Sequence, residues 1–256
     1  MVNNLLLISG IGMMLVGIII PICYWKTKKV SVKFFAFGAA LWIFAITLKI
    51  IMDLTISPFL SSYLFEFGTV LFVILYGFYV GFRTGIFESG LTYIIAIKTK
   101  LKNLNYKQAF ALGLGFGGFE AAVIGFLSFI NILVFVVSPD IINLVPDEAQ
   151  RQVLITSLNQ PTILVGVGIL ERIVIIPIHV FTTLLVFYTI KSGDKKYLFS
   201  SIGFKTIVDG IIPALQVYVG TQTVLSSYLM ELPFIGLGII AIGGIFWIKK
   251  LWNEKS

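Results

Sequence analysis

Long apolar stretches follow one another along almost the whole chain, separated by short polar segments. A helix of about 20 apolar residues spans the hydrocarbon core of a bilayer. Stretches of this length occur at residues 4–25, 32–52, 68–97, 108–137, 162–190, 198–218 and 223–248. Residues 54–67 form either a separate interfacial segment or the beginning of a long, broken third helix. The pattern predicts an all-α, polytopic transmembrane helical bundle with about seven spans, built as a single domain over residues 1–256.

Composition agrees with this prediction and narrows the partners. Only 12% of the residues are charged, about half the fraction in soluble domains, and the mean hydropathy is +1.00. The net charge of +7 comes from basic residues at the ends of apolar runs, where they anchor helices in the bilayer. We therefore expect the lipid bilayer, and no nucleic acid, as a partner. Cys23 is the only cysteine, so no intrachain disulfide forms, and we expect it to be a small packed hydrophobe.

The basic residues also predict the orientation of the spans. Clusters lie at alternate ends of the apolar stretches: Lys26, Lys28, Lys29 and Lys33; Lys98, Lys100, Lys102 and Lys107; Lys191, Lys195 and Lys196; and Lys249, Lys250 and Lys255. The opposite side holds Arg151, and Lys49 is placed near that membrane edge. Positive residues mark the cytoplasmic face. We expect a multi-pass protein of the cell membrane with its N-terminus outside and its C-terminus inside.

Residues 138–161 form the one long external connection. Pro146, Asp147 and Glu148 make a good helix opening, with proline early and acidic residues in the first turn. A helix on the membrane surface is the favoured interpretation, and a lid over a substrate is the alternative.

Several ionisable residues lie well inside the apolar stretches. A charge at the bilayer centre costs roughly 2.5–3.5 kcal/mol on insertion scales, so such residues are usually paired and often functional. Counting about 1.5 Å per residue from the lysine clusters places many of them roughly 13–20 Å from the cytoplasmic side. The candidates are Arg83, Glu88, Glu120, Glu171, Arg172, His179, Lys205 and Asp209.

Spacing within each helix predicts how these groups meet. Lys205 and Asp209 are four residues apart, which permits a direct ion pair. Arg172 and His179 are seven apart and share a face, whereas Glu171 points elsewhere and lies further toward the outside. Arg83 reaches Glu88, five residues on, only if the helix bends. Separate ion pairs that tie helices together would explain each pair, but groups from four helices at one depth favour a common polar cavity.

Residues 113–120 carry the glycine-rich sequence GLGFGGFE. Its likeness to the dinucleotide-binding G-x-G-x-x-G is spurious, because no strand precedes it and no βαβ unit surrounds it. Small residues in a membrane helix let neighbouring backbones approach closely. We expect helix packing here, with access of a substrate backbone to Glu120 as an additional interpretation.

Four motifs in this region resemble those of the YhfC family of intramembrane proteases, which is related to the CAAX-processing/Abi and PrsW-type membrane proteases. Residues 85–93 (GIFESGLTY) are similar to G-x-F-E-E-x-x-R-Y, and residues 115–121 (GFGGFEA) to G-H-G-G-x-E-A. Glu171-Arg172 with His179, and residues 205–209 (KTIVD), which are similar to H-x-x-x-D, complete the match over residues 83–213.

The resemblance implies a membrane-embedded glutamic or metallo-endopeptidase acting on a membrane-embedded protein or peptide. By position, Glu88 and Glu120 would act as water-activating or metal-binding carboxylates and Asp209 would orient the site; Arg83, Glu171, Arg172, His179 and Lys205 would bind or balance charge. Four family positions are substituted, by Ser89, Thr92, Phe116 and Lys205. A catalytic zinc needs about three protein ligands, and a phenylalanine and an ammonium cannot serve. We expect no metal and no other cofactor.

Three functions stay open at this point. The first is a divergent intramembrane protease-like protein, with weak or no proteolysis, that binds membrane substrates. The second is a small transporter or permease, for which internal Glu, His and Lys would suit a proton relay. The third is a non-catalytic assembly subunit. Substrate, oligomeric state and physiological role do not follow from the sequence.

Overall fold

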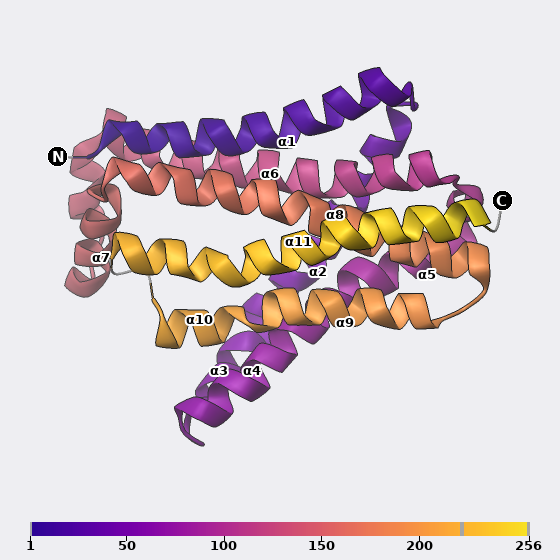
Figure 1. The fold of residues 1–256 in the computed structure, drawn as a ribbon. Helices are drawn as coiled ribbons and strands as arrows, with labels where there is room; N and C mark the ends of the chain where they lie inside the picture. The colour runs from indigo at the N-terminus through magenta and orange to yellow at the C-terminus, as the bar shows by residue number, and fades with distance from the viewer. Residues whose placement is uncertain (1, 221–222, 255–256) are drawn as a thin grey trace.

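The computed structural model describes residues 2–220 and 223–254, and these form a bundle of long helices (Figure 1). The α-helices are α1 (Leu7–Lys28), α2 (Lys33–Thr55), α3 (Ser57–Phe65), α4 (Thr69–Thr84), α5 (Leu91–Lys98), α6 (Tyr106–Val137), α7 (Glu148–Leu158), α8 (Val165–Ser192), α9 (Lys196–Gly210), α10 (Ile212–Tyr218) and α11 (Val224–Glu254). Short 3₁₀ turns cover Asn4–Leu6, Lys100–Asn103, Pro139–Leu144 and Thr162–Leu164.

Seven of the helical segments in the described part are long and apolar enough to cross a membrane, which confirms the predicted spans. The third span consists of α4, a wider turn and α5, and the sixth consists of α9 and α10. Residues 54–67 contain α3 as a separate helix, because the positive φ of Gly68 interrupts the chain before α4. The structure contains no bilayer, so the predicted orientation of the termini stays a prediction.

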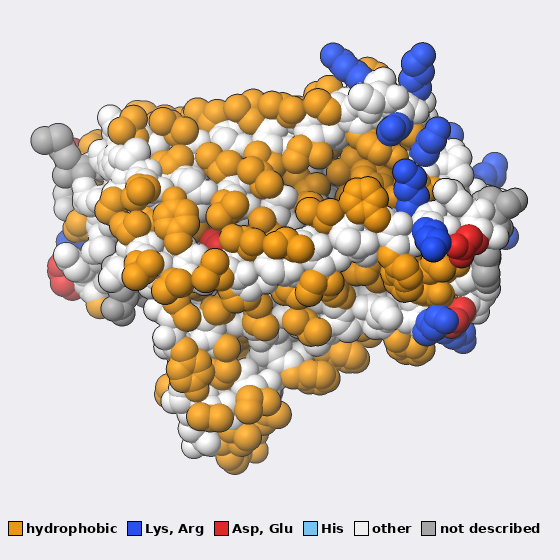
Figure 2. Space-filling model, viewed as in Figure 1, with side chains coloured by type: hydrophobic (Ala, Val, Ile, Leu, Met, Phe, Trp, Pro, Cys, Tyr) orange, Lys and Arg blue, Asp and Glu red, His pale blue; other side chains and the backbone are white. Residues whose placement is uncertain are grey.

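Lysine and arginine side chains gather at the end of the bundle where the C-terminus lies, and apolar side chains cover its middle (Figure 2). We call this the lysine-rich end, and the opposite end, where α7 lies, the α7 end (Figure 1). α7 begins where the sequence predicted, because the Asp147 side chain accepts a hydrogen bond from the backbone N–H of Gln150. Cys23 is exposed, so the expectation that it is packed is wrong; it lies on the outer surface of α1.

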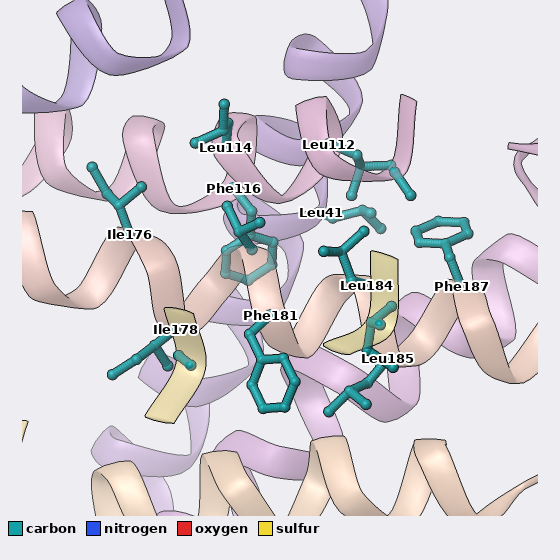
Figure 3. Packing of buried hydrophobic residues seen from close by; sticks show 14 of the residues in the cluster. Leu41, Leu112, Leu114, Phe116, Ile176, Ile178, Phe181, Leu184, Leu185 and Phe187 are labelled. Atoms are coloured by element: carbon teal, nitrogen blue, oxygen red, sulfur yellow. The ribbon is translucent and has the colours of Figure 1, made fainter. Parts of the chain in front are cut away.

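The core lies around α6 and α8. α6 packs against α1, α2 and α8, and α8 also packs against α11, α1 and α9. Almost every residue of α8 from Ile175 to Thr189 is buried. The side chains labelled in Figure 3 come from α2, α6 and α8 and fill the space between these helices: Leu41, Leu112, Leu114, Phe116, Ile176, Ile178, Phe181, Leu184, Leu185 and Phe187.

Glycines allow the helices around α6 to touch through their backbones. A Cβ on Gly115 would lie 2.2 Å from the Phe35 carbonyl oxygen of α2, and one on Gly117 would lie 3.0 Å from Cβ of His179. The packing interpretation of residues 113–120 is therefore confirmed, since neighbouring helices occupy these glycine faces.

A second glycine seam, between α4 and α9, positions the polar residues of both helices. Gly77, Gly81 and Gly85 repeat every four residues and therefore lie on one face of the third span. A Cβ on Gly81 would lie 2.0 Å from the Thr206 carbonyl oxygen of α9, and one on Gly85 would lie 2.6 Å from that of Ile202. This close approach brings the turn after α4 against the middle of α9.

The turn after α4 is a single stretch of π-helix, Gly85–Gly90. Its wider spacing appears in the backbone N–H of Leu91, which bonds the carbonyl oxygen of Ile86, five residues earlier. π-Helical turns inside α-helices occur frequently at functional sites. Here the turn carries Glu88 and Ser89, and both are buried.

Replacing Gly81 with alanine tests the α4–α9 seam. Because the added methyl has no room against the α9 backbone, we expect a loss of about 1–3 kcal/mol in the free energy of unfolding, as in other overpacked cores. Gly203→Ala on α9 is the matched control, since a Cβ there meets nothing within 4 Å. Unfolding of the purified protein in detergent measures both, and equal stability of the two variants would contradict the seam.

Candidate functional site

Ionisable side chains from five helical segments converge on one cavity in the middle of the bundle. The cavity has a volume of about 200 Å³. Its ionisable lining residues are Lys49, Glu88, Glu120, Glu171, Arg172, His179, Lys205 and Asp209. The predicted common polar cavity is therefore present, and among the predicted site residues only Arg83 does not line it.

The buried carboxylate of Glu88 lies between two ammonium groups. Its Oε2 is 2.6 Å from Nζ of Lys205 on α9, and its Oε1 is 2.6 Å from Nζ of Lys49 on α2. The Glu88 and Lys205 side chains are each 4% exposed. Burying a lone charge in a medium of low dielectric constant is very costly, so each of these groups depends on its partners for stability.

His179 connects the two glutamates. Its Nδ1 lies 2.8 Å from Nζ of Lys205, and its Nε2 lies 3.1 Å from Oε2 of Glu120. An ammonium group only donates hydrogen bonds, so Nδ1 accepts from Lys205. The proton of the neutral imidazole is then on Nε2, from which it is donated to Glu120. This assignment follows from the hydrogen-bond partners.

Glu120 also accepts hydrogen bonds from Trp42 of α2 and from Arg172 of α8. The indole Nε1–H of Trp42 donates to Oε2 at 2.8 Å, and Arg172 donates from its Nη1 to Oε1 at 3.0 Å. Nη2 of Arg172 donates to Glu171, whose side chain is 37% exposed. Arg172 and His179 thus contact the same carboxylate, as expected from their shared face.

The predicted pair between Lys205 and Asp209 is replaced by other contacts. Lys205 contacts Glu88 and His179, whereas Asp209 accepts a hydrogen bond from the Thr84 hydroxyl at 2.6 Å. The close contact between α4 and α9 explains this outcome. It brings Glu88 to Lys205 and Thr84 to Asp209, so each group on α9 finds a nearer partner than the other one, a turn away on the same helix.

Arg83 pairs with Asp53 of α2, and not with Glu88. It also donates a hydrogen bond to the backbone carbonyl oxygen of Lys49 at 3.4 Å. Glu88 lies in the π-helical turn, which begins two residues after Arg83. Arg83 pairs with Asp53 and Glu88 with Lys49, two residues one turn apart on α2. Arg83 therefore lies at the margin of the site, and its electrostatic role stays a prediction.

Lys49 and Trp42 are members of the site that the sequence analysis missed. Lys49 was placed near a membrane edge, but its side chain is 12% exposed and contacts Glu88. Its position inside an apolar stretch, four residues before Asp53, was a usable signal. Trp42 gave no signal, because a tryptophan in a membrane helix is ordinary and its hydrogen bond to Glu120 depends on how α2 packs against α6.

The donor set does not fit a catalytic metal. The Lys205 ammonium lies between Glu88 and His179, the two groups that would otherwise offer an oxygen and a nitrogen ligand. The ring of Phe116 lies 4.9 Å from the ring of His179 and 5.7 Å from Nζ of Lys205. The residues described here contain no group of three or more histidine, cysteine or acidic side chains arranged to hold a metal ion.

Replacing Lys205 with methionine tests its role as the internal cation. Removing one partner of a buried ion pair typically costs about 3–5 kcal/mol, because the other charge is left uncompensated, and we expect a loss of this size. Lys196→Met on the same helix removes an exposed ion pair with Asp194 and should leave stability unchanged. The double variant with Glu88→Gln should regain part of the loss. Thermal unfolding in detergent checks all three, and a Lys205→Met variant as stable as the control would refute the role.

Comparisons with known proteins place this site in a family. No curated protein matches the chain, and no solved structure matches it. Residues 12–232 match the family described as YhfC intramembrane metalloprotease, and this range includes every ionisable residue that lines the polar cavity. The chain therefore belongs to the YhfC intramembrane metalloprotease family.

Proposed function

We propose that the protein is a divergent member of this family whose polar cavity binds membrane-embedded protein segments and cleaves them weakly or not at all. The observation that carries the proposal is the Lys205 ammonium, 2.6 Å from Glu88 and 2.8 Å from His179. It supplies the positive charge at the centre of the site from a side chain. No step of this proposal uses a metal.

The hydrogen bonds of the site favour binding over catalysis. A general base needs a lone pair directed at the proton that it removes. Oε1 of Glu88 accepts a hydrogen bond from Lys49 and Oε2 is ion-paired with Lys205, while Glu120 contacts indole, imidazole and guanidinium groups. Hydrolysis by either glutamate would first require one of these ion pairs to open.

The lining of the cavity suits a segment of membrane protein. Ile175, Ile212 and Phe234 give it apolar lining from α8, α10 and α11 in addition to the charged groups. A membrane-embedded segment is apolar along its side chains, but its peptide groups need hydrogen-bond partners wherever the helix is interrupted. A cavity with both apolar and charged lining offers both. We place this activity in the cell membrane.

Transport is less well supported. On the side of the site toward Thr92, Thr182 and Val186, the adjoining cavity measures about 10 Å³, enough for a single water molecule at most. A solute crossing the bundle through the charged site would have to pass there. The geometry supports a site that is closed on this side, and therefore binding more than passage.

Binding of synthetic single-span peptides in detergent tests the proposal. We expect a subset of a peptide panel to bind the wild-type protein, and Ile212→Trp, which fills the cavity, to weaken that binding at least ten-fold. Leu232→Trp is the control, since Leu232 is an exposed residue of α11. Mass spectrometry should find cleavage at background level, unchanged in Glu88→Gln and Glu120→Gln, and metal analysis should find less than stoichiometric zinc.

Two outcomes would contradict the proposal. Cleavage that is rapid in the wild-type protein and lost in either glutamine variant would show an active glutamic protease. Peptide binding that Ile212→Trp and Leu232→Trp affect equally would show that peptides bind elsewhere on the protein.

A further inference from the structure

A cavity opens at the α7 end, between α7 and the beginning of α11. It has a volume of about 560 Å³. Its polar lining residues are Thr156, Asn159, Gln160 and Thr223. Leu164, at the beginning of the fifth span, also lines it. Thr156 and Asn159 are exposed, so the cavity reaches the surface of the protein.

A second cavity, of about 270 Å³, continues from the first toward the middle of the bundle. The two share Gln160 and Leu164 as lining residues. Further along, the second cavity is lined by Gly168 of α8 and by Ser227 and Glu231 of α11. Ser227 and Glu231 are four residues apart, so both lie on one face of α11, and α11 packs against α8.

The charged site is the third cavity of the series. Gly168 lines the second cavity and Glu171 the third, while Glu231 lines the second and Phe234 the third. Three residues correspond to about 4.5 Å along a helix. The two cavities are therefore successive along both α8 and α11, and the series leads from the α7 end to the ion pairs of Glu88 and Glu120.

Buried polar atoms in these cavities lack protein partners. Glu231 is 8% exposed, and its Oε2 has no hydrogen-bond partner among the described residues; the same holds for Nε of Arg172, in the third cavity. A buried polar group without a partner costs about 1–3 kcal/mol. Where the surrounding space is polar and large enough, ordered water normally supplies the missing hydrogen bonds.

The surface over the contact between α8 and α11 also carries polar atoms. Acidic side-chain atoms interrupt the apolar face of the molecule in the band where α8 and α11 lie (Figures 1 and 2). The side of the charged site toward Thr92 and Val186, in contrast, adjoins a cavity of about 10 Å³.

We infer that the three cavities form a water-filled conduit along the contact between α8 and α11, from the α7 end to the charged site. The carboxyl group of Glu231 lies midway along it. Water and small hydrated ions would reach the site from this end, and the conduit would stop there. The inference deepens the proposed function, because a membrane segment bound at the site needs water for its exposed peptide groups. The experiment that tests the conduit uses no peptide, so its result does not depend on whether peptides bind.

Silver ions test the conduit, because Ag⁺ travels through water, does not enter hydrocarbon, and replaces the proton of a cysteine thiol. In a Cys23→Ala background, Ile175→Cys places a thiol in the third cavity. We expect this variant in lipid nanodiscs to gain one silver within seconds, as measured by intact-protein mass spectrometry. Leu232→Cys, on the exposed side of α11, should stay unmodified.

Filling the second cavity should close the route. Adding Ser227→Leu or Glu231→Leu to Ile175→Cys should slow silver uptake at least ten-fold, and adding Leu229→Phe on the exposed side of α11 should not. Variants are compared after gel filtration confirms that they elute as the parent does. No uptake at Ile175→Cys, or uptake that neither leucine slows, would overturn the conduit.

Discussion

The ion pair between Lys205 and Glu88 is the interaction on which the rest of the site depends. Both side chains are almost fully buried, and Nζ lies 2.6 Å from the carboxylate. In a dry interior neither charge would be tolerated alone. Through His179, the same ammonium group is connected to Glu120 and then to Arg172 and Trp42. One lysine thus holds together side chains from α2, α6, α8, α9 and the π-helical turn.

The pair exists because the helices are in backbone contact. Gly81 and Gly85 have no side chain, so the third span lies directly against the backbone of α9. Gly115 and Gly117 likewise let α6 approach α2 and α8 closely. Without a hydrophobic driving force between helices in lipid, such close packing and interhelical hydrogen bonds drive their association. The apolar packing and the polar site are therefore coupled: each glycine seam sets the distance across which an ion pair forms.

A site that carries its own cation differs from one that recruits a metal. A metal ion leaves open coordination positions for water or substrate, whereas the ammonium of Lys205 fills the space between Glu88 and His179 itself. The family is described as one of intramembrane metalloproteases, and in this chain Glu88 and His179 both contact the ammonium group of Lys205. That ammonium balances the charge of Glu88 without offering an open coordination position, which is the physical basis for the binding role proposed above.

The sequence by itself predicted the seven spans, the helix α7, the family and a common polar cavity for Glu88, Glu120, His179, Lys205 and Asp209. The family follows from a resemblance of motifs, and the rest follows from hydropathy, spacing along a helix and the cost of burying charge, all of which are local or one-dimensional properties. Only the tertiary structure decided the partners: Lys205 with Glu88 and not Asp209, Arg83 with Asp53, and Lys49 inside the site. Partners are chosen across helices, by backbone separations of a few ångströms that glycine seams and a π-helical turn set. A residue count along one helix carries no information about those separations.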